Sequence, residues 1–224
     1  MTGRRAGLAA LIVGGAVFAL ALQYVATPQT VAAGVTAAAR PGTPRADLKV
    51  ATFAAGCFWC TEADFDGLSG VVATTAGYTG GRKASPSYVQ VSSGGTGHVE
   101  SVQVLYDPSK VSYEQLLDHY WAHVDPFVMN QQFCDAGEQY SPEIFVTTPE
   151  ERAAAEASLA RLQQRARRPI AVQIRDASAF YKAEEEHQDY ARKHPIAYNY
   201  YRWGCGRDAR TADIQRLLTP AHVK

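Results

Sequence analysis

Two cysteines three residues apart constrain this chain most, because they stand where a strand meets a helix. They belong to residues 56–60, whose sequence is Gly-Cys-Phe-Trp-Cys. Residues 49–55 before them predict a strand, and residues 61–68 after them have helical spacing. Unpaired N–H groups at a helix N-terminus favour an anion, so we expect Cys57 to react as a thiolate near neutral pH. Cys60 follows one turn later on the same helix face, within reach of a disulfide.

This pair of thiols has three interpretations. A CxxC pair directly after a strand favours redox or nucleophilic chemistry. Buried cysteines beside aromatic side chains are also common as inert packing. A zinc site usually needs two paired ligand sets, and the sequence has one CxxC pair. His119 and His123 are four residues apart on a predicted helix, but no third ligand stands near them, so we expect no metal.

The N-terminal part of the chain differs from the rest. Arg4 and Arg5 are followed by no charged residue until Arg40, and residues 6–26 are largely apolar. This pattern predicts that residues 1–27 are a secretory signal peptide or a membrane anchor. The protein is therefore expected to be exported, and to be periplasmic or anchored facing the periplasm.

The remaining boundaries follow from composition. Residues 28–47 are rich in Ala, Thr, Pro and Gly and predict a flexible linker. Residues 48–218 are then a single catalytic domain, and residues 219–224 are a C-terminal tail. The chain has 22 basic and 22 acidic side chains, so its charge gives no reason to expect nucleic acid as a partner.

Predicted strands and helices alternate along this domain. The strands are residues 49–55, 71–77, 98–106 and 171–174, and the helices are residues 61–68, a segment from Ser112, residues 149–167 and residues 184–193. This order predicts an α+β fold, a two-layer sandwich with a ferredoxin-like mixed or antiparallel sheet. We expect the helices on one side of the sheet and long functional loops between the elements.

One predicted strand carries a carboxyl group on its apolar face. Alternation along residues 98–106 puts Glu100 on the same side as Val102, Val104 and Tyr106. A carboxyl group in such a place either finds a partner or has a raised pKa, which makes it a proton donor near pH 7. The alternative is a solvated glutamate at a strand end.

Several further segments, taken together with Gly-Cys-Phe-Trp, resemble one enzyme family. They are residues 76–81 (AGYTGG), 86–88 (PSY), 97–100 (GHVE), 135–140 (DAGEQY) and 180–188 (FYKAEEEHQ). In this order and spacing the chain resembles the peptide methionine sulfoxide reductases of the A type, over roughly residues 49–205. The resemblance implies that the substrate is the S epimer of methionine sulfoxide, free or in proteins.

The resemblance also implies roles for individual residues. Cys57 would attack the sulfoxide sulfur as a thiolate, and Glu100 would donate the proton that lets the oxygen leave as water. Tyr88 and Tyr140 would donate hydrogen bonds to that oxygen. Asp135 would organise the polar side of the site.

Residues next to the nucleophile would bind the substrate. Phe58 and Trp59, beside Gly56, would hold the methyl group of the substrate in an apolar pocket. His98 also matches a family segment, and we favour a structural hydrogen-bonding role for it.

The sulfenic acid left on Cys57 would be resolved by a second thiol. We prefer Cys60 on its geometry. Cys205 is the next choice, as resolver or second relay, because glycines flank it in a tail expected to be flexible; Cys134 is third. The resemblance implies no bound cofactor, and regeneration by an external dithiol reductant of the thioredoxin type, relayed across the membrane if the domain is exported. We expect a monomer.

The alternative function is a thioredoxin-like thiol–disulfide oxidoreductase that uses Cys57 and Cys60. It is disfavoured because it leaves Glu100, Tyr88 and Tyr140 without a role.

Overall fold

The computed structural model describes residues 48–218 of the chain. The predicted signal peptide or anchor, the linker and the C-terminal tail lie outside these residues. Within residues 48–218, no helix combines the length and the apolar character needed to cross a membrane.

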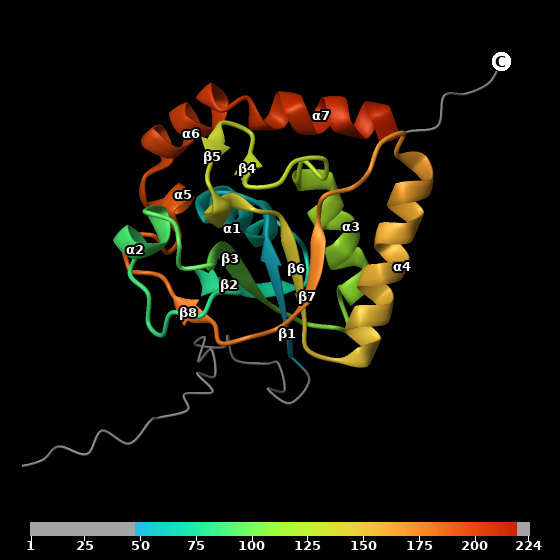
Figure 1. Cartoon of the computed structure of the whole chain (residues 1–224), viewed down its shortest axis with the longest axis horizontal. Helices are drawn as coiled ribbons and strands as arrows, with labels where there is room; N and C mark the ends of the chain where they lie inside the picture. The colour runs from blue at the N-terminus through green and yellow to red at the C-terminus, as the bar shows by residue number, and fades with distance from the viewer. Residues whose placement is uncertain (1–47, 219–224) are drawn as a thin grey trace, which may run out of the picture. The chain divides into compact units, whose positions relative to one another are not determined.

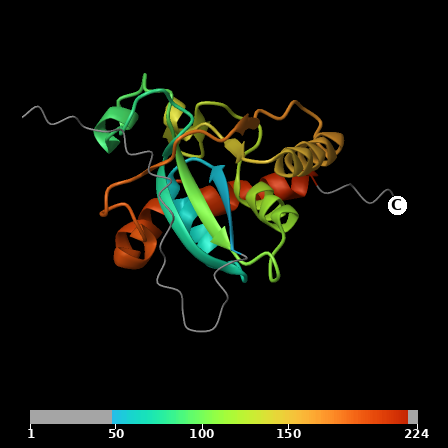
Figure 2. The ribbon, with the colours of Figure 1, turned by 90° about the horizontal axis from the view of Figure 1, so that it is seen from below.

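A six-stranded sheet forms the centre of the domain (Figure 1). Its order is β7-β6-β1-β3-β2-β8, and all neighbours are antiparallel except β6 and β7, which are parallel. The strands are β1 (Lys49–Ala54), β2 (Val71–Thr79), β3 (Val99–Tyr106), β6 (Glu143–Val146), β7 (Gln173–Asp176) and β8 (Tyr181–Lys182). A separate hairpin consists of β4 (Gln131–Gln132) and β5 (Asp135–Ala136). The longest strands, β2 and β3, run side by side (Figure 2).

Seven α-helices and one 3-10 helix accompany this sheet in the described part of the chain. They are α1 (Phe58–Asp66), α2 (Tyr88–Ser92), α3 (Tyr113–His123), η1 (Glu138–Tyr140), α4 (Pro149–Arg165), α5 (Tyr190–Lys193), α6 (Pro195–Gly204) and α7 (Arg207–Leu218). Local sequence explains several starts: Ser112 and Gln115 form a capping box before α3, and Thr148 caps α4 with Pro149 at its first position. The predicted α+β class with a mixed sheet is confirmed.

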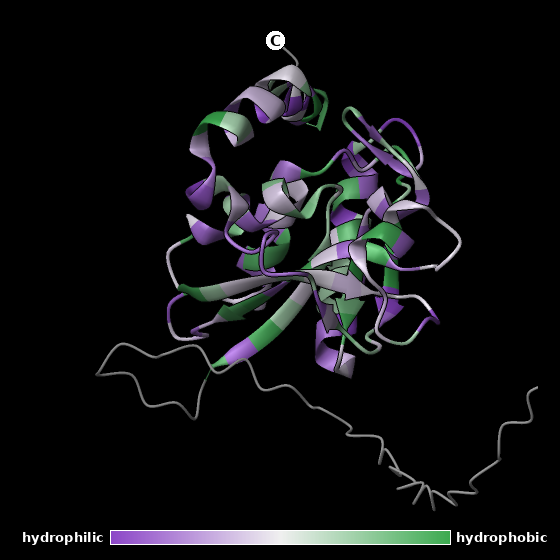
Figure 3. Ribbon diagram, turned by 90° about the vertical axis from the view of Figure 1, so that its left-hand side faces the viewer, coloured by the Kyte–Doolittle hydropathy of each residue, from purple (hydrophilic) through white to green (hydrophobic). Residues whose placement is uncertain are grey.

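Aromatic side chains join the sheet to α1 and α3. Phe53 of β1 stacks on Phe65 of α1 at 5.1 Å and on Tyr120 of α3 at 5.4 Å between ring centroids. The Tyr120 hydroxyl donates to the carbonyl oxygen of Ala54 at 3.1 Å. In Figure 3 the hydrophobic segments lie largely along the strands and the helix segments packed against them. These contacts fix the end of β1, where the two cysteines follow.

The region after β7 differs from the sequence prediction. The predicted helix over residues 184–193 is wrong, and only α5 is helical there. Side chains of this segment bond to distant backbone instead: Gln188 Nε2 donates to the carbonyl oxygen of Ala76 at 2.9 Å, and Gln188 Oε1 accepts from the Ala76 N–H at 3.0 Å. Asp189 then adopts a left-handed conformation with φ 54°, which interrupts any helix. Tertiary hydrogen bonds thus override helical propensity.

The C-terminal residues are more regular than expected. The segment around Cys205 was expected to be a flexible tail, but it joins two helices, α6 and α7. Helix α5 ends at Lys193, and Pro195 begins α6, because proline is tolerated at a first helical position. Helix α2 was not predicted, and β7 begins at Gln173 rather than at residue 171.

Candidate active site

Cys57 lies at the N-cap of α1, immediately after β1. Gly56 before it has φ +86°, a left-handed conformation that favours glycine. A Cβ atom at Gly56 would lie 2.4 Å from the Cβ of Gln132, so the hairpin that carries Gln132 approaches too closely for any side chain. The absence of a side chain at Gly56 therefore allows both the turn before Cys57 and the close contact with Gln132.

Cys57 and Cys60 form a buried pair of free thiols. Their exposed fractions are 7% and 2%. The Cys60 N–H donates to the Cys57 carbonyl oxygen at 3.1 Å in the first turn of α1, and the two side chains are hydrogen-bonded to each other. The structure therefore brings together the two sulfurs that the CxxC spacing predicted to meet.

The charges of this pair differ from the expectation that Cys57 is the thiolate. Burial raises the pKa of Cys57 well above its usual range, which outweighs the favourable helix terminus. The pKa of Cys60 is lowered, first by the hydrogen bond from Cys57 and then by the guanidinium groups of Arg207 and Arg202. Cys60 is therefore the more acidic thiol of the pair, and Cys57 donates to it.

Glu100 lies on β3 beside this pair. Its side chain is 2% exposed, and its Oε2 accepts a hydrogen bond from the Phe58 N–H at 3.0 Å, so it occupies a free N–H of the first turn of α1. Burial raises the pKa of Glu100 to about 8. The carboxyl is thus mostly protonated at neutral pH, and its charge, when present, raises the pKa of Cys57.

Tyr88 and Tyr140 reach the same centre from α2 and η1. Burial raises the pKa of both phenols, and the charges of Glu100 and Cys57 raise both further. Both hydroxyls therefore keep their protons and lie within electrostatic reach of the carboxyl and the thiol. Glu184 holds the start of α2, because its Oε1 accepts from the Tyr88 N–H at 2.8 Å.

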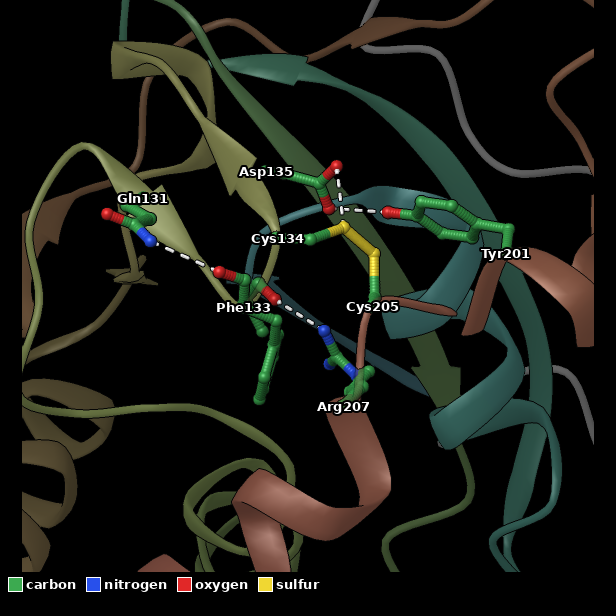
Figure 4. The surroundings of a disulfide bond; sticks show 8 residues. Gln131, Phe133, Cys134, Asp135, Tyr201, Cys205 and Arg207 are labelled. Carbon is green, nitrogen blue, oxygen red and sulfur yellow. Dashed lines mark hydrogen bonds between the residues drawn. A yellow bond between two sulfur atoms is a disulfide. The ribbon is translucent and has the colours of Figure 1, made fainter. Parts of the chain in front are cut away.

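Asp135 borders the site from β5. Burial raises the pKa of Asp135, while a hydrogen bond from the Tyr201 hydroxyl to its Oδ2 lowers it (Figure 4). The Sγ of Cys134 lies 3.7 Å from Asp135 Oδ1. A disulfide sulfur has no proton to donate, so this is a contact only.

Phe58 and Trp59 begin an aromatic cluster. Phe58 is 1% exposed and lies 5.2 Å from the ring of His187 and 6.5 Å from that of Tyr88. Trp59 stacks on Tyr190 at 3.8 Å, and its Nε1 donates to His187 Nδ1 at 3.2 Å. The cluster supplies an apolar surface beside Cys57.

Cys134 and Cys205 form a disulfide with their Cα atoms 4.9 Å apart (Figure 4). Cys205 is consequently not a free thiol on a flexible tail, which corrects the expectation that it swings in to Cys57. Arg207, which follows at the start of α7, forms an ion pair with Asp64 at 3.0 Å, and its guanidinium lies 4.4 Å from the centre of the Phe133 ring. The bridge and this arginine hold α7 against the hairpin.

The histidines that the sequence drew attention to contact backbone carbonyls. His119 Nε2 lies 2.8 Å from the Asp64 oxygen, and His123 Nδ1 lies 2.8 Å from the His119 oxygen. His98 Nδ1 accepts from the Gly81 N–H at 3.2 Å. Over residues 48–218, the one group of three possible metal ligands is Cys134, Asp135 and Cys205, whose sulfurs are bonded to each other.

Residues 49–217 match the family model described as peptide methionine sulfoxide reductase. The chain belongs to this family. Over 184 residues the reductase is 44% identical to a peptide methionine sulfoxide reductase MsrA 2 from Caulobacter vibrioides, covering 82% of this chain and 93% of the relative. Over 162 residues it is 45% identical to MsrA from Bacillus licheniformis, covering 71% and 90%. It is 42% identical over 181 residues to MsrA/MsrB from Vibrio cholerae, where it spans 48% of the relative.

Solved structures agree with this assignment. The reductase superposes on reduced Mxr1 from Saccharomyces cerevisiae with a TM-score of 0.64 and 30% identity, covering 69% of this chain and 90% of that one. For methionine sulfoxide reductase A of Corynebacterium diphtheriae the TM-score is 0.60 at 32% identity, covering 69% and 78%.

The sequence analysis missed two groups in this reductase site. Tyr201 bonds to Asp135, and Arg207 lowers the pKa of Cys60. Both come from α6 and α7, whose helical form was not expected. The cluster of tyrosines and the tryptophan in residues 198–203 was the available signal for an aromatic contribution to the site.

Proposed function

We propose that this methionine sulfoxide reductase acts on the S epimer of its substrate, free or in proteins, with Cys57 as the nucleophile and Glu100 as the general acid. One observation supports this most: a carboxyl with a pKa of about 8 is bonded to the first N–H of the helix that Cys57 caps. Such a group holds a proton at neutral pH and can give it to an oxygen bound beside Cys57.

The chemistry starts from the resting thiol pair. Cys60 in its thiolate form, which its lowered pKa favours, takes the proton of Cys57 through the hydrogen bond that joins them. The Cys57 thiolate forms a bond to the sulfoxide sulfur while Glu100 protonates the oxygen, which takes a second proton from solvent and leaves as water. Methionine departs when water attacks the Cys57 sulfur, which returns one proton and leaves a sulfenic acid.

The phenols and the aromatic rings bind the substrate. Tyr88 and Tyr140 keep their protons and donate hydrogen bonds to the leaving oxygen. Asp135 completes the polar side of the site. The methyl group of the substrate lies against Phe58 and Trp59. Gly56, which turns the chain before Cys57, is the third residue of this substrate-binding set.

Cys60 then resolves the sulfenic acid. Its thiol condenses with the Cys57 sulfenic acid, forming the disulfide and releasing water. Overall, one sulfoxide and two thiols yield one thioether, one disulfide and one water. Cys60 is preferred as the resolving thiol because it is already hydrogen-bonded to Cys57, whereas Cys205 is held in a disulfide with Cys134.

An external dithiol of the thioredoxin type regenerates the thiols, so the enzyme needs no bound cofactor. Cys57 and Cys60 are buried, but Cys134 is exposed. The Cys134–Cys205 bridge is therefore the proposed second relay, which the donor reduces and which passes its electrons inward by thiol–disulfide exchange. The alternative function, a thioredoxin-like oxidoreductase, remains disfavoured because it leaves Glu100, Tyr88 and Tyr140 without a role.

We also propose that the reductase is an exported monomer. The support is the apolar segment of residues 6–26 behind Arg4 and Arg5, which suits a signal peptide or an anchor facing the periplasm. The thioredoxin-type donor would then receive its electrons through a relay across the membrane.

The test is to map the disulfides after one turnover without reductant. The full chain, with the Cys134–Cys205 bridge intact and the Cys57 pair reduced, is mixed with a peptide containing methionine S-sulfoxide and analysed by mass spectrometry. A Cys57–Cys60 bond is expected, with one methionine formed per chain. A bond from Cys57 to Cys205 overturns the assignment of the resolver. Turnover of the R epimer at an equal rate overturns the proposed substrate.

A further inference from the structure

The phenol of Tyr201 lies between two groups of the active site. Its hydroxyl donates to Asp135 Oδ2 and lies near enough to the Cys57 sulfur to lower the pKa of that thiol. The chemistry proposed above gives Tyr201 no role. We propose that Tyr201 is a further catalytic residue, whose O–H donates to Asp135 while Cys57 carries its proton and to the Cys57 sulfur once the thiolate forms. The proposal rests on Cys57 being the nucleophile.

Both the ring and the backbone of Tyr201 are held in place. The edge of the ring meets Trp59, with centroids 5.9 Å apart and planes at 82°. Within α6, the Cys205 N–H donates to the Tyr201 carbonyl oxygen at 2.9 Å. Cys205 is bonded to Cys134, the neighbour of Asp135, so the disulfide ties the helix of the phenol to the strand of its acceptor (Figure 4).

The phenol acts as a hydrogen-bond donor and not as a base. Burial raises the pKa of Tyr201 far above its usual range, and the charges of Cys57 and Asp135 raise it further. Tyr201 thus keeps its proton throughout. The proton that Cys57 releases goes to Cys60, and Tyr201 only changes which acceptor it faces, so no proton is gained or lost at the phenol.

The donor is needed because the surroundings of Cys57 disfavour its thiolate. Burial is the largest cause of its raised pKa, and Cys60 and Glu100 add to it, while the Tyr201 hydroxyl lowers it. The titratable groups that act on the Cys57 sulfur are Cys60 of α1, Tyr88 of α2, Glu100 of β3, Tyr140 of η1 and Tyr201 of α6. Asp135 of β5 is the acceptor of the Tyr201 hydroxyl. Removal of the Tyr201 hydroxyl leaves the Cys57 thiolate without the donor that α6 supplies.

The test compares Tyr201→Phe with Tyr200→Phe in the full chain. The neighbour Tyr200 is 75% exposed, so its hydroxyl serves as a matched control. A hydrogen bond to a charged group changes an equilibrium about tenfold to a hundredfold. Tyr201→Phe is therefore expected to slow methionine formation in a single turnover by about that factor, and Tyr200→Phe is expected to match the wild type.

A titration separates this role from a structural one. In a Cys60→Ser background with the Cys134–Cys205 bridge intact, Cys57 is the remaining free thiol, and the pH dependence of its alkylation by iodoacetamide, measured by mass spectrometry, follows its ionisation. Tyr201→Phe is expected to move the midpoint up by roughly one to two pH units, in line with one lost charged hydrogen bond. An unchanged midpoint overturns the inference. A double-mutant cycle with Asp135→Asn is expected to show coupling in the same midpoint, and additive effects overturn it as well.

The outcomes distinguish this inference from the proposed function. If Cys57→Ser still reduces the sulfoxide at the wild-type rate, the proposed function fails. If Cys57→Ser is inactive but Tyr201→Phe behaves like Tyr200→Phe in rate and midpoint, only the role of Tyr201 fails.

Discussion

Replacing Glu100 by glutamine removes the proposed acid while keeping the shape of the side chain. With a pKa of about 8, roughly nine-tenths of Glu100 is protonated at pH 7, whereas a carboxyl at the ordinary value of 4.5 would be protonated in about 0.3% of molecules. Burial thus multiplies the population of the acid about 300-fold. Glutamine still accepts the hydrogen bond from the Phe58 N–H, but it cannot donate an acidic proton.

The expected loss follows from that change. General acid catalysis contributes about 10²- to 10⁴-fold, so Glu100→Gln should slow methionine formation in a single turnover by that factor at pH 7. The wild-type rate should fall as pH rises through about 8, because the protonated form is present below that pH and is lost above it. The variant should lack this decline. Rapid quench at several pH values, with methionine measured directly, gives both results.

A second buried glutamate provides the control. Glu62 is also 2% exposed, its pKa is raised by burial to about 7, and its Oε2 accepts from the Asp189 N–H at 2.7 Å. Glu62→Gln should therefore leave the rate close to that of the wild type. A Glu100→Gln enzyme as fast as the wild type at pH 7 would refute the reasoning, as would an equal loss in Glu62→Gln.

Three further changes test other parts of the structure. Cys60→Ser should form methionine once, more slowly than the wild type because Cys57 loses its proton acceptor, and then stop with a sulfenic acid on Cys57 that a dimedone adduct reveals by mass. Continued turnover with the thioredoxin-type donor would contradict the role of Cys60. Gly56→Ala should lower the free energy of unfolding in urea by at least about 1–3 kcal/mol, because the new Cβ meets Gln132 and φ is +86°; an unchanged midpoint would speak against that contact. Cys134→Ser should lower the free energy of unfolding by about 4 kcal/mol, since the bridge that it removes closes a sequence separation of 71 residues. A variant as stable as the disulfide-bonded wild type would contradict this.

Local patterns predicted much of the path that leads to Cys57. The strand, Gly56 and the helix start were all visible because each depends on near neighbours in sequence. The alternation of β3 likewise put Glu100 on a buried face, and Val102, Val104 and Tyr106 are buried there as expected.

Other parts of the site depend on long-range packing that no local pattern contains. The disulfide joins residues 71 apart, and the Tyr201 hydroxyl bonds to Asp135 across 66 positions. The thiolate was assigned to Cys57 because a helix terminus favours an anion, but the burial that reverses this preference comes from elements far away in the chain. For the same reason, the polar residues that bond to β2 were mistaken for a helix.

The burial of the Cys57 sulfur also affects how far the sulfenic acid intermediate can be oxidised. A sulfenic acid open to solvent can be oxidised by peroxide to a sulfinic acid, which thiols do not reverse. At Cys57 only 7% of the residue is open to solvent, while Cys60 is already in contact. The intermediate therefore meets an internal thiol before it meets a second oxidant, and the catalyst should withstand the peroxide that creates its substrate.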